Sequence, residues 1–163
     1  MSGDVDFVLG KKKDSSRILN DYPNVLEKWP GKTLYWLSEP YAAFLYEILN
    51  RRSAKQARTH VELLREFKTL ATKESDQIDE ETSKMAGVEV KYRLAYLFEF
   101  PDQLTEMIAA LGEADLIAVA AEWGPMLPGI SGPSLEILHD LSKLCREAKK
   151  KKLSIFVVDN CMY

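Results

Sequence analysis

The segment LSIFVVD at positions 153–159 constrains the fold more than any other part of this chain. A strand with one buried face is apolar at alternate positions, whereas a strand that is apolar at nearly every position needs cover on both faces. The segment therefore predicts a central strand of a sheet, with other elements packed on each side of it. The rest of the chain has to supply neighbouring strands and enough helices to cover them.

Two helices are expected in the N-terminal half. Ser38 is a good N-cap residue, and the helix after it has an apolar stripe made of Phe44, Leu45, Ile48 and Leu49. A second helix is expected to begin at Ser53 and to carry on one face Ala57, Val61, Leu64, Phe67 and Leu70 or Ala71. Apolar residues at this spacing are typical of amphipathic helices.

Three more helices are expected in the C-terminal half. Asp102 follows Pro101 and caps a helix that carries Leu104, Ile108 and Leu111. A short helix spans 113–123 and stops at Gly124, and the Gly- and Pro-rich stretch 124–134 is the longest clear loop. Ser134 caps the last helix, whose inward stripe is Leu135, Leu138, Leu141, Leu144, Cys145 and Ala148. Lys149 to Lys152 lie at its end, where positive charge complements the helix dipole.

Further strands are expected at two places. The stretch 33–37 is short, β-branched and aromatic, and 88–100 alternates as a half-buried strand does, although it also fits a helix. Residues 72–84 are polar and acidic and are read as a loop or an exposed helical turn. Residues 1–16 are expected to form a loose arm or an edge strand.

These elements add up to one domain over residues 1–163, of the α+β class, with about five helices on a small sheet. The chain shows no internal repeat and no linker, and 46% of its residues are apolar. Its formal net charge of -3 disfavours general nucleic-acid binding. Two cysteines without a paired spacing favour a reducing compartment. No secretory signal or membrane span is evident, so we expect a cytoplasmic protein.

The pair His139-Asp140 is the sharpest chemical motif, because metal-dependent phosphohydrolases of the HD type use such a pair. A divalent ion needs several ligands at once, and the chain has only one other histidine, His60. We therefore favour a simple position on the flank of an amphipathic helix. A small metal-dependent hydrolase using His60, His139 and Asp140 stays as the alternative.

Three other motifs do not carry a reaction. PGKT at 30–33 lacks the glycine that a phosphate-binding loop requires, since Leu26 stands at that position. The GISGPS stretch does not have the spacing of a serine nucleophile elbow. Cys145 lies on the core stripe of the last helix and is expected to act as a small apolar residue. We therefore expect no catalytic residues, no metal and no cofactor.

Two features are candidates for partner binding. Five acidic residues lie within eight positions, namely Glu74, Asp76, Asp79, Glu80 and Glu81. Such a segment either keeps a protein soluble or attracts a basic partner. Trp123, beside the Gly- and Pro-rich loop, is of the residue type that often anchors an interface.

From about Phe100 onward, the order is a capped helix, LIAVAAEWGPML, the helix LEILHDLSKLCREAKKKK and the strand LSIFVVD. This pattern resembles the C-terminal half of small bacterial cytosolic proteins, including immunity proteins that neutralise a toxin by binding it. The resemblance contains no diagnostic residue, so it assigns no site.

The favoured reading is a non-catalytic binding protein, an acidic inhibitor or immunity protein whose partner is another protein, such as a basic toxin or nuclease. A structural subunit of a phage or defence assembly is the second alternative. The sequence leaves the oligomeric state open.

Overall fold

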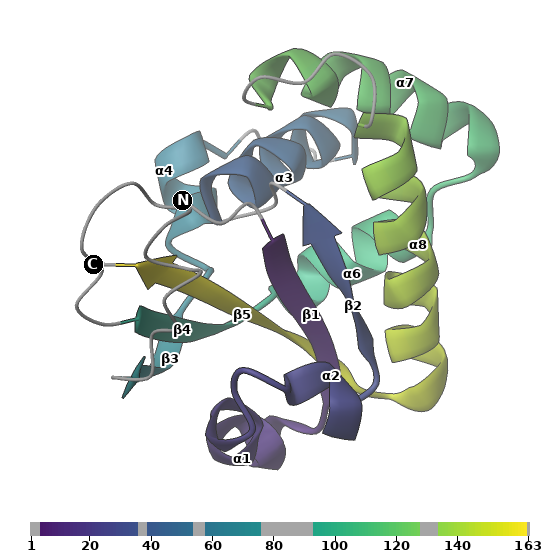
Figure 1. Cartoon of the computed structure of the whole chain (residues 1–163). Helices are drawn as coiled ribbons and strands as arrows, with labels where there is room; N and C mark the ends of the chain where they lie inside the picture. The colour runs from purple at the N-terminus through teal and green to yellow at the C-terminus, as the bar shows by residue number, and fades with distance from the viewer. Residues whose placement is uncertain (1–3, 36–38, 54–57, 76–92, 128–133, 163) are drawn as a thin grey trace.

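The structure is a computed structural model, and it describes residues 4–35, 39–53, 58–75, 93–127 and 134–162. It is an α+β fold in which helices lie on both faces of an antiparallel five-stranded sheet (Figure 1). The strands are ordered β2-β1-β5-β4-β3 across the sheet. They span Asp4–Gly10 (β1), Gly31–Tyr35 (β2), Thr69–Ser75 (β3), Arg93–Glu99 (β4) and Ser154–Met162 (β5).

The central strand β5 is the one that the sequence predicts. It pairs with β1 on one side, where Val157 faces Phe7, and with β4 on the other, where Val158 faces Leu97. Residues 155–158 are all buried. Successive side chains of a strand point to opposite faces, so this run is apolar throughout because both faces of the sheet are covered.

The larger helical layer covers one face of the sheet. It consists of α3 (Glu39–Ser53), α4 (His60–Leu64), α6 (Asp102–Ala109), α7 (Glu113–Trp123) and α8 (Ser134–Lys151). Their buried apolar residues form one cluster with the strand residues on this face, Phe7 and Val157 among them. This cluster is the main core.

A smaller layer covers the opposite face, and the sequence gives little sign of it. Two short helices, α1 (Ser15–Asn20) and α2 (Val25–Lys28), pack Ile18, Leu19 and Val25 against the sheet. Phe156 and Val158 of β5 belong to this second cluster. Helices of four to six residues show too few turns to produce a readable period.

The expectation for residues 1–16 is wrong for residues 4–16, the part of this stretch that the structure describes. Residues 4–10 form β1, which lies inside the sheet between β2 and β5, and is therefore neither a loose arm nor an edge strand. A 3-10 turn, η1 (Lys12–Asp14), then leads into α1. The physical reason is burial on both faces, because Phe7 lies in the main core while Val8 lies in the second cluster.

The long helix expected from Ser53 is also wrong. Ser53 is the last residue of α3, and the next helix, α4, has only five residues. Thr59 caps α4 by accepting a hydrogen bond from the backbone of Glu62, whose side chain reaches back to the backbone of Thr59. Such a capping box fixes a helix start. Val61, expected inside, is 56% exposed.

The chain after α4 turns into a strand. Thr69–Ser75 is β3, at the edge of the sheet, so the reading of 72–84 as loop or helical turn is wrong for 72–75, and residues 76–84 lie outside the described residues. The strand predictions for 33–37 and 88–100 are confirmed by β2 and β4 within the described ranges. Residues 36–37 and 88–92 are not described.

The helices of the C-terminal half follow the sequence closely. Asp102 is the first residue of α6 and Pro101 its N-cap, one position from the expectation. Helix α7 ends at Trp123 and is followed by a 3-10 turn, η2 (Gly124–Met126), inside the stretch expected as loop. Helix α8 begins at Ser134, and its stripe is buried apart from the partly exposed Leu135. None of the helices in the described ranges is both long and apolar enough to cross a bilayer.

Removal of apolar volume under α1 tests the second layer. Ile18 is fully buried against the sheet, while Ile117 on α7 is 51% exposed. We expect Ile18→Ala to lower the free energy of unfolding by about 2–5 kcal/mol. The matched change Ile117→Ala should alter it by no more than about 0.5 kcal/mol. Urea unfolding of both variants measures the difference, and equal effects would contradict the placement of α1.

Candidate functional site

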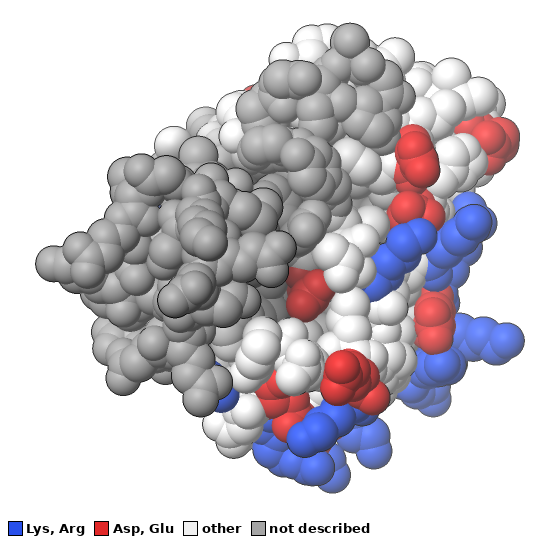
Figure 2. Space-filling view, in the orientation of Figure 1, with Lys and Arg blue, Asp and Glu red and all other residues white. Residues whose placement is uncertain are grey.

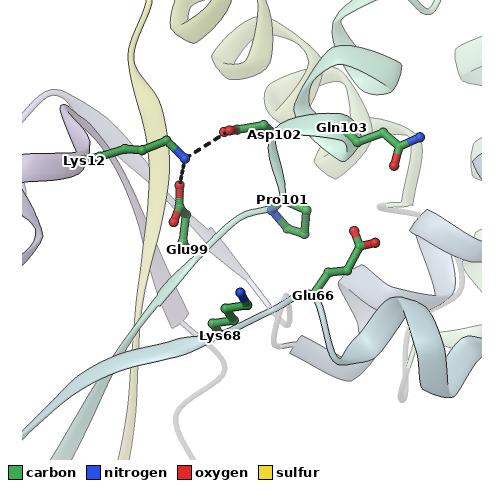
Figure 3. Close-up of a pocket in the computed structure, with 7 residues that line it drawn as sticks. All are labelled: Lys12, Glu66, Lys68, Glu99, Pro101, Asp102 and Gln103. Atoms are coloured by element: carbon green, nitrogen blue, oxygen red, sulfur yellow. Dashed lines mark hydrogen bonds and ion pairs between the residues drawn. The ribbon is translucent and has the colours of Figure 1, made fainter.

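A cleft lined by charged side chains opens where η1, the segment before β3 and the start of α6 meet. We call it the charged cleft. Its volume is about 250 Å³, and it is lined by Lys12, Glu66, Lys68, Glu99, Pro101, Asp102 and Gln103 (Figure 3). These residues come from separate stretches of the chain, so only the folded protein brings them together.

Lys12 joins two of these stretches. Its ammonium lies 2.7 Å from Oε1 of Glu99, at the end of β4, and 3.0 Å from Oδ2 of Asp102, at the start of α6. The hydrogen bond to Glu99 is the main cause of a raised Lys12 pKa, so the ammonium stays charged. The Lys12 side chain is 65% exposed, and exposed ion pairs contribute little to stability. The bridge positions charges rather than holding the fold together.

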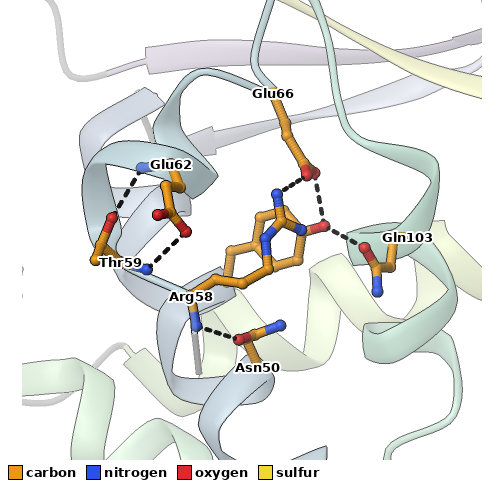
Figure 4. Close-up of polar contacts among 7 residues, drawn as sticks. Asn50, Arg58, Thr59, Glu62, Glu66 and Gln103 are labelled. Carbon is orange, nitrogen blue, oxygen red and sulfur yellow. Dashed lines mark hydrogen bonds and ion pairs between the residues drawn. The ribbon is translucent and has the colours of Figure 1, made fainter. Parts of the chain in front are cut away.

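Tyr46 of α3 supports the wall of the charged cleft that Glu66 and Gln103 form. Its hydroxyl donates to Oε2 of Glu66 at 2.7 Å and lies 2.9 Å from Oε1 of Gln103 (Figure 4). A phenol has one proton, and an ionised carboxylate is the stronger acceptor. Burial is the main cause of a raised Tyr46 pKa, and the carboxylate of Glu66 adds to it. Tyr46 therefore stays a neutral donor.

Arg58 completes the support of Glu66. Its guanidinium pairs with Oε1 of Glu66, and this hydrogen bond is the main cause of a raised Arg58 pKa. The backbone N–H of Arg58 donates to Oδ1 of the buried Asn50 at 3.1 Å. The capped start of α4 follows directly, as Figure 4 shows. The Glu66 carboxylate thus has a cation on one oxygen and a phenol on the other.

Lys68 lines the charged cleft directly before the edge strand β3, and Leu70 follows it within that strand. The side chain of Lys68 makes no ion pair or hydrogen bond within the part of the chain that the structure describes. The register of β3 shifts between Thr69, which faces Phe98, and Ala71, which faces Leu97. Leu70 is the extra residue of this bulge and is 43% exposed. A bulge can re-aim a side chain, and here an apolar side chain of the edge strand is exposed to solvent.

The three residues proposed for the alternative metal site, His60, His139 and Asp140, each contact a different partner. His60 on α4 stacks on Phe44 with ring centroids 4.2 Å apart. His139 Nε2 lies 3.2 Å from Glu113 of α7, while Asp140 pairs with Lys32 of β2 at 2.8 Å. Within the described ranges, no group of three or more His, Cys, Asp or Glu side chains could hold a metal ion. The structure therefore does not bring these three residues to one centre.

Trp123 is not a surface anchor. It is fully buried in the main core, and its indole N–H donates to the backbone carbonyl of Tyr41 at 2.9 Å. A large aromatic ring with its single donor satisfied is a packing residue, so the expectation of an interface role is corrected. Of the acidic segment, Glu74 belongs to β3, and Asp76, Asp79, Glu80 and Glu81 lie outside the described residues. Its role stays a prediction.

The charged cleft itself was not found from the sequence. One local signal was readable, since Thr59 and Glu62 have the spacing of a capping box just before the wall of the cleft. Lys12 and Glu99 are separated by 87 positions, and no pattern in the sequence marks them as neighbours. Ion pairs between distant exposed residues follow from the fold rather than from local sequence.

Comparison with protein-family models, with curated proteins and with solved structures gave no match. The resemblance to immunity proteins therefore stays a prediction.

Removal of the Tyr46 hydroxyl tests the wall of the charged cleft. Tyr46→Phe keeps the ring but leaves one oxygen of Glu66 without its donor, so we expect a loss of about 1–3 kcal/mol in the free energy of unfolding at neutral pH. A tyrosine of the unfolded chain ionises near pH 10, while the folded pKa is higher. The stability that Tyr46 provides is thus present below about pH 10 and declines above it. Urea unfolding across this range should show the cost of Tyr46→Phe shrinking as the pH rises.

The thiol of Cys145 should resist modification. It is fully buried on α8, and burial raises its pKa well above the ordinary value. Only the thiolate is reactive. In a Cys161→Ser background, we expect a thiol reagent to label Cys145 only after addition of denaturant. Rapid labelling of the folded protein would contradict its position in the core.

Proposed function

We propose that this chain is a protein-binding domain whose partner docks on the charged cleft, with Leu70 as the apolar anchor. The observation that carries the proposal is the bulge in β3, which leaves Leu70 exposed two positions after Lys68, a residue that lines the charged cleft. Interfaces between proteins commonly have a small apolar centre and a polar rim. Leu70 would provide the apolar centre of such an interface, and the charged side chains of the cleft its polar rim.

The charges of the cleft suit a partner that carries charges of its own. Glu66 is oriented by Arg58 and Tyr46, and Glu99 and Asp102 are oriented by Lys12. Groups held before binding lose less conformational freedom when a partner docks. The open ammonium of Lys68 and these carboxylates provide both signs, which favours orientation and specificity of docking more than affinity.

The partner that we propose is a basic protein, such as a toxin or nuclease, which this chain would inhibit by binding it. The acidic residues of 74–81 begin on β3 itself with Glu74 and continue along the chain beyond it. Acidic residues near a docking surface raise the association rate of a basic partner by electrostatic steering. In this role the chain acts by covering its partner and carries out no reaction.

A charge placed on the apolar anchor tests the proposal. The tagged protein is purified from its source cells, and the proteins that remain bound are quantified by mass spectrometry. We expect Leu70→Lys to reduce capture of the partner by about tenfold or more, since a lysine on an edge strand opposes docking there. Capture should also fall in about 1 M salt, where the Debye length is about 3 Å.

Ile117→Lys provides the matched control, because Ile117 is an exposed apolar residue on α7, away from β3. It introduces the same side chain and should leave capture unchanged. If Leu70→Lys and Ile117→Lys capture the same partner equally well, docking at Leu70 is excluded.

A further inference from the structure

Two lysine-rich stretches from opposite ends of the chain lie at one place in the fold. We call this place the lysine surface, and it is defined by the three lysines that line one pocket, Lys12, Lys149 and Lys152. A pocket of about 330 Å³ lies within it and is lined by Lys12 of η1 and by Lys149 and Lys152 at the end of α8. Figure 2 shows basic and acidic side chains interspersed along the lower and right margins of this view.

The helix dipole does not account for this arrangement. Cations at the last turn of α8 complement the dipole, but the effect is confined to that turn and does not account for Lys12, which reaches the pocket from η1. The chain as a whole has a formal charge of -3, whereas Lys149 and Lys152 line this pocket together with Lys12, whose ammonium already pairs with Glu99 and Asp102. Such a patch creates a local positive potential on an acidic protein.

Lys152 provides a second, independent observation. Its φ is +57°, the left-handed region, and it follows directly after the end of α8. The N–H of Leu153 bonds back to the carbonyl of Ala148, which closes the helix. Glycine is the usual residue at such a position, because a side chain there is strained. A lysine whose side chain lines the pocket stands there instead.

We infer that the lysine surface is a second docking surface and that its occupant is an acidic segment of a protein. Carboxylates of Asp102 and Glu106 also line the pocket, so its positive charge is interrupted. A nucleic-acid backbone carries one charge per about 1.7 Å of duplex and would meet these carboxylates. Separate acidic side chains can reach the lysines between them.

The apolar wall of the pocket fits the same occupant. Ala148 and Leu153 line it beside the lysines. The methylene groups of a glutamate side chain can pack on such a wall while its carboxylate meets Lys149 or Lys152, as the stems of long charged side chains commonly do.

Binding of a fluorescein-labelled oligoglutamate peptide, followed by fluorescence anisotropy, tests the inference. Lys149→Glu should weaken binding about fivefold, since it replaces an attraction with a repulsion. Lys143→Glu is the matched control on the same helix, because Lys143 is also exposed but does not line the pocket. It should change binding less than about twofold. Equal losses in the two variants would overturn the inference.

Lys152→Gly separates binding from folding. Glycine relieves the left-handed strain, so the melting temperature should rise while peptide binding weakens. A variant that is more stable and binds unchanged would show that Lys152 has no part in the surface.

Two further measurements complete the test. The first asks whether peptide binding at the lysine surface depends on Leu70, and the second asks which class of polyanion the surface prefers. Leu70→Lys should leave peptide binding unchanged, so this test separates peptide binding at the lysine surface from the proposed docking of a partner at Leu70. A single-stranded oligonucleotide of the same net charge should bind more weakly than the peptide, and tighter binding that is lost in Lys149→Glu would overturn the choice of an acidic protein segment.

Discussion

The burial of β5 on both faces is the constraint on which the rest of the structure depends. Its apolar run has to be covered by the main helical layer on one side and by α1 and α2 on the other. Both strands beside it are therefore buried at their centres as well. Because both faces of the sheet are covered at its middle, charged and exposed side chains are left to the ends of the strands and to the two outer strands, β2 and β3.

The two surfaces that we propose follow from this arrangement. The charged cleft forms where β4 ends and α6 begins, and Lys12 reaches it from the end of β1. The lysine surface forms where α8 ends and β5 begins, and Lys12 lines its pocket too. The two sites share Lys12 and Asp102. The short segment η1, which carries Lys12, therefore belongs to both the charged cleft and the lysine surface.

The fold class, the central strand and the C-terminal helices could be predicted because each depends on a local pattern. The stripe of α8 and the run of β5 are long enough to show their patterns.

The predictions were wrong where tertiary contacts decided the structure. Val61 and Leu70 fit a helical face by spacing, yet both are exposed, and a capping box at Thr59 with a bulge at Leu70 interrupts the helix. Trp123 looked like a surface residue because of the loop beside it, whereas its hydrogen bond to Tyr41 places it inside. The charged cleft could not be predicted, since its residues meet only after the sheet has formed.

The pairing of β1 with β5 has a consequence for how the chain is made. Asp6 faces Val158 in the sheet, so a strand near the start of the chain has its inner neighbour near the far end. During synthesis on the ribosome, β1 can pair with β2 early, but its other edge has no partner until β5 has left the exit tunnel. Contacts between residues so distant in sequence slow folding. The edge of β1 that faces β5 therefore stays unpaired until residues 154–162 have been made, and an unpaired strand edge can pair with another chain during that interval.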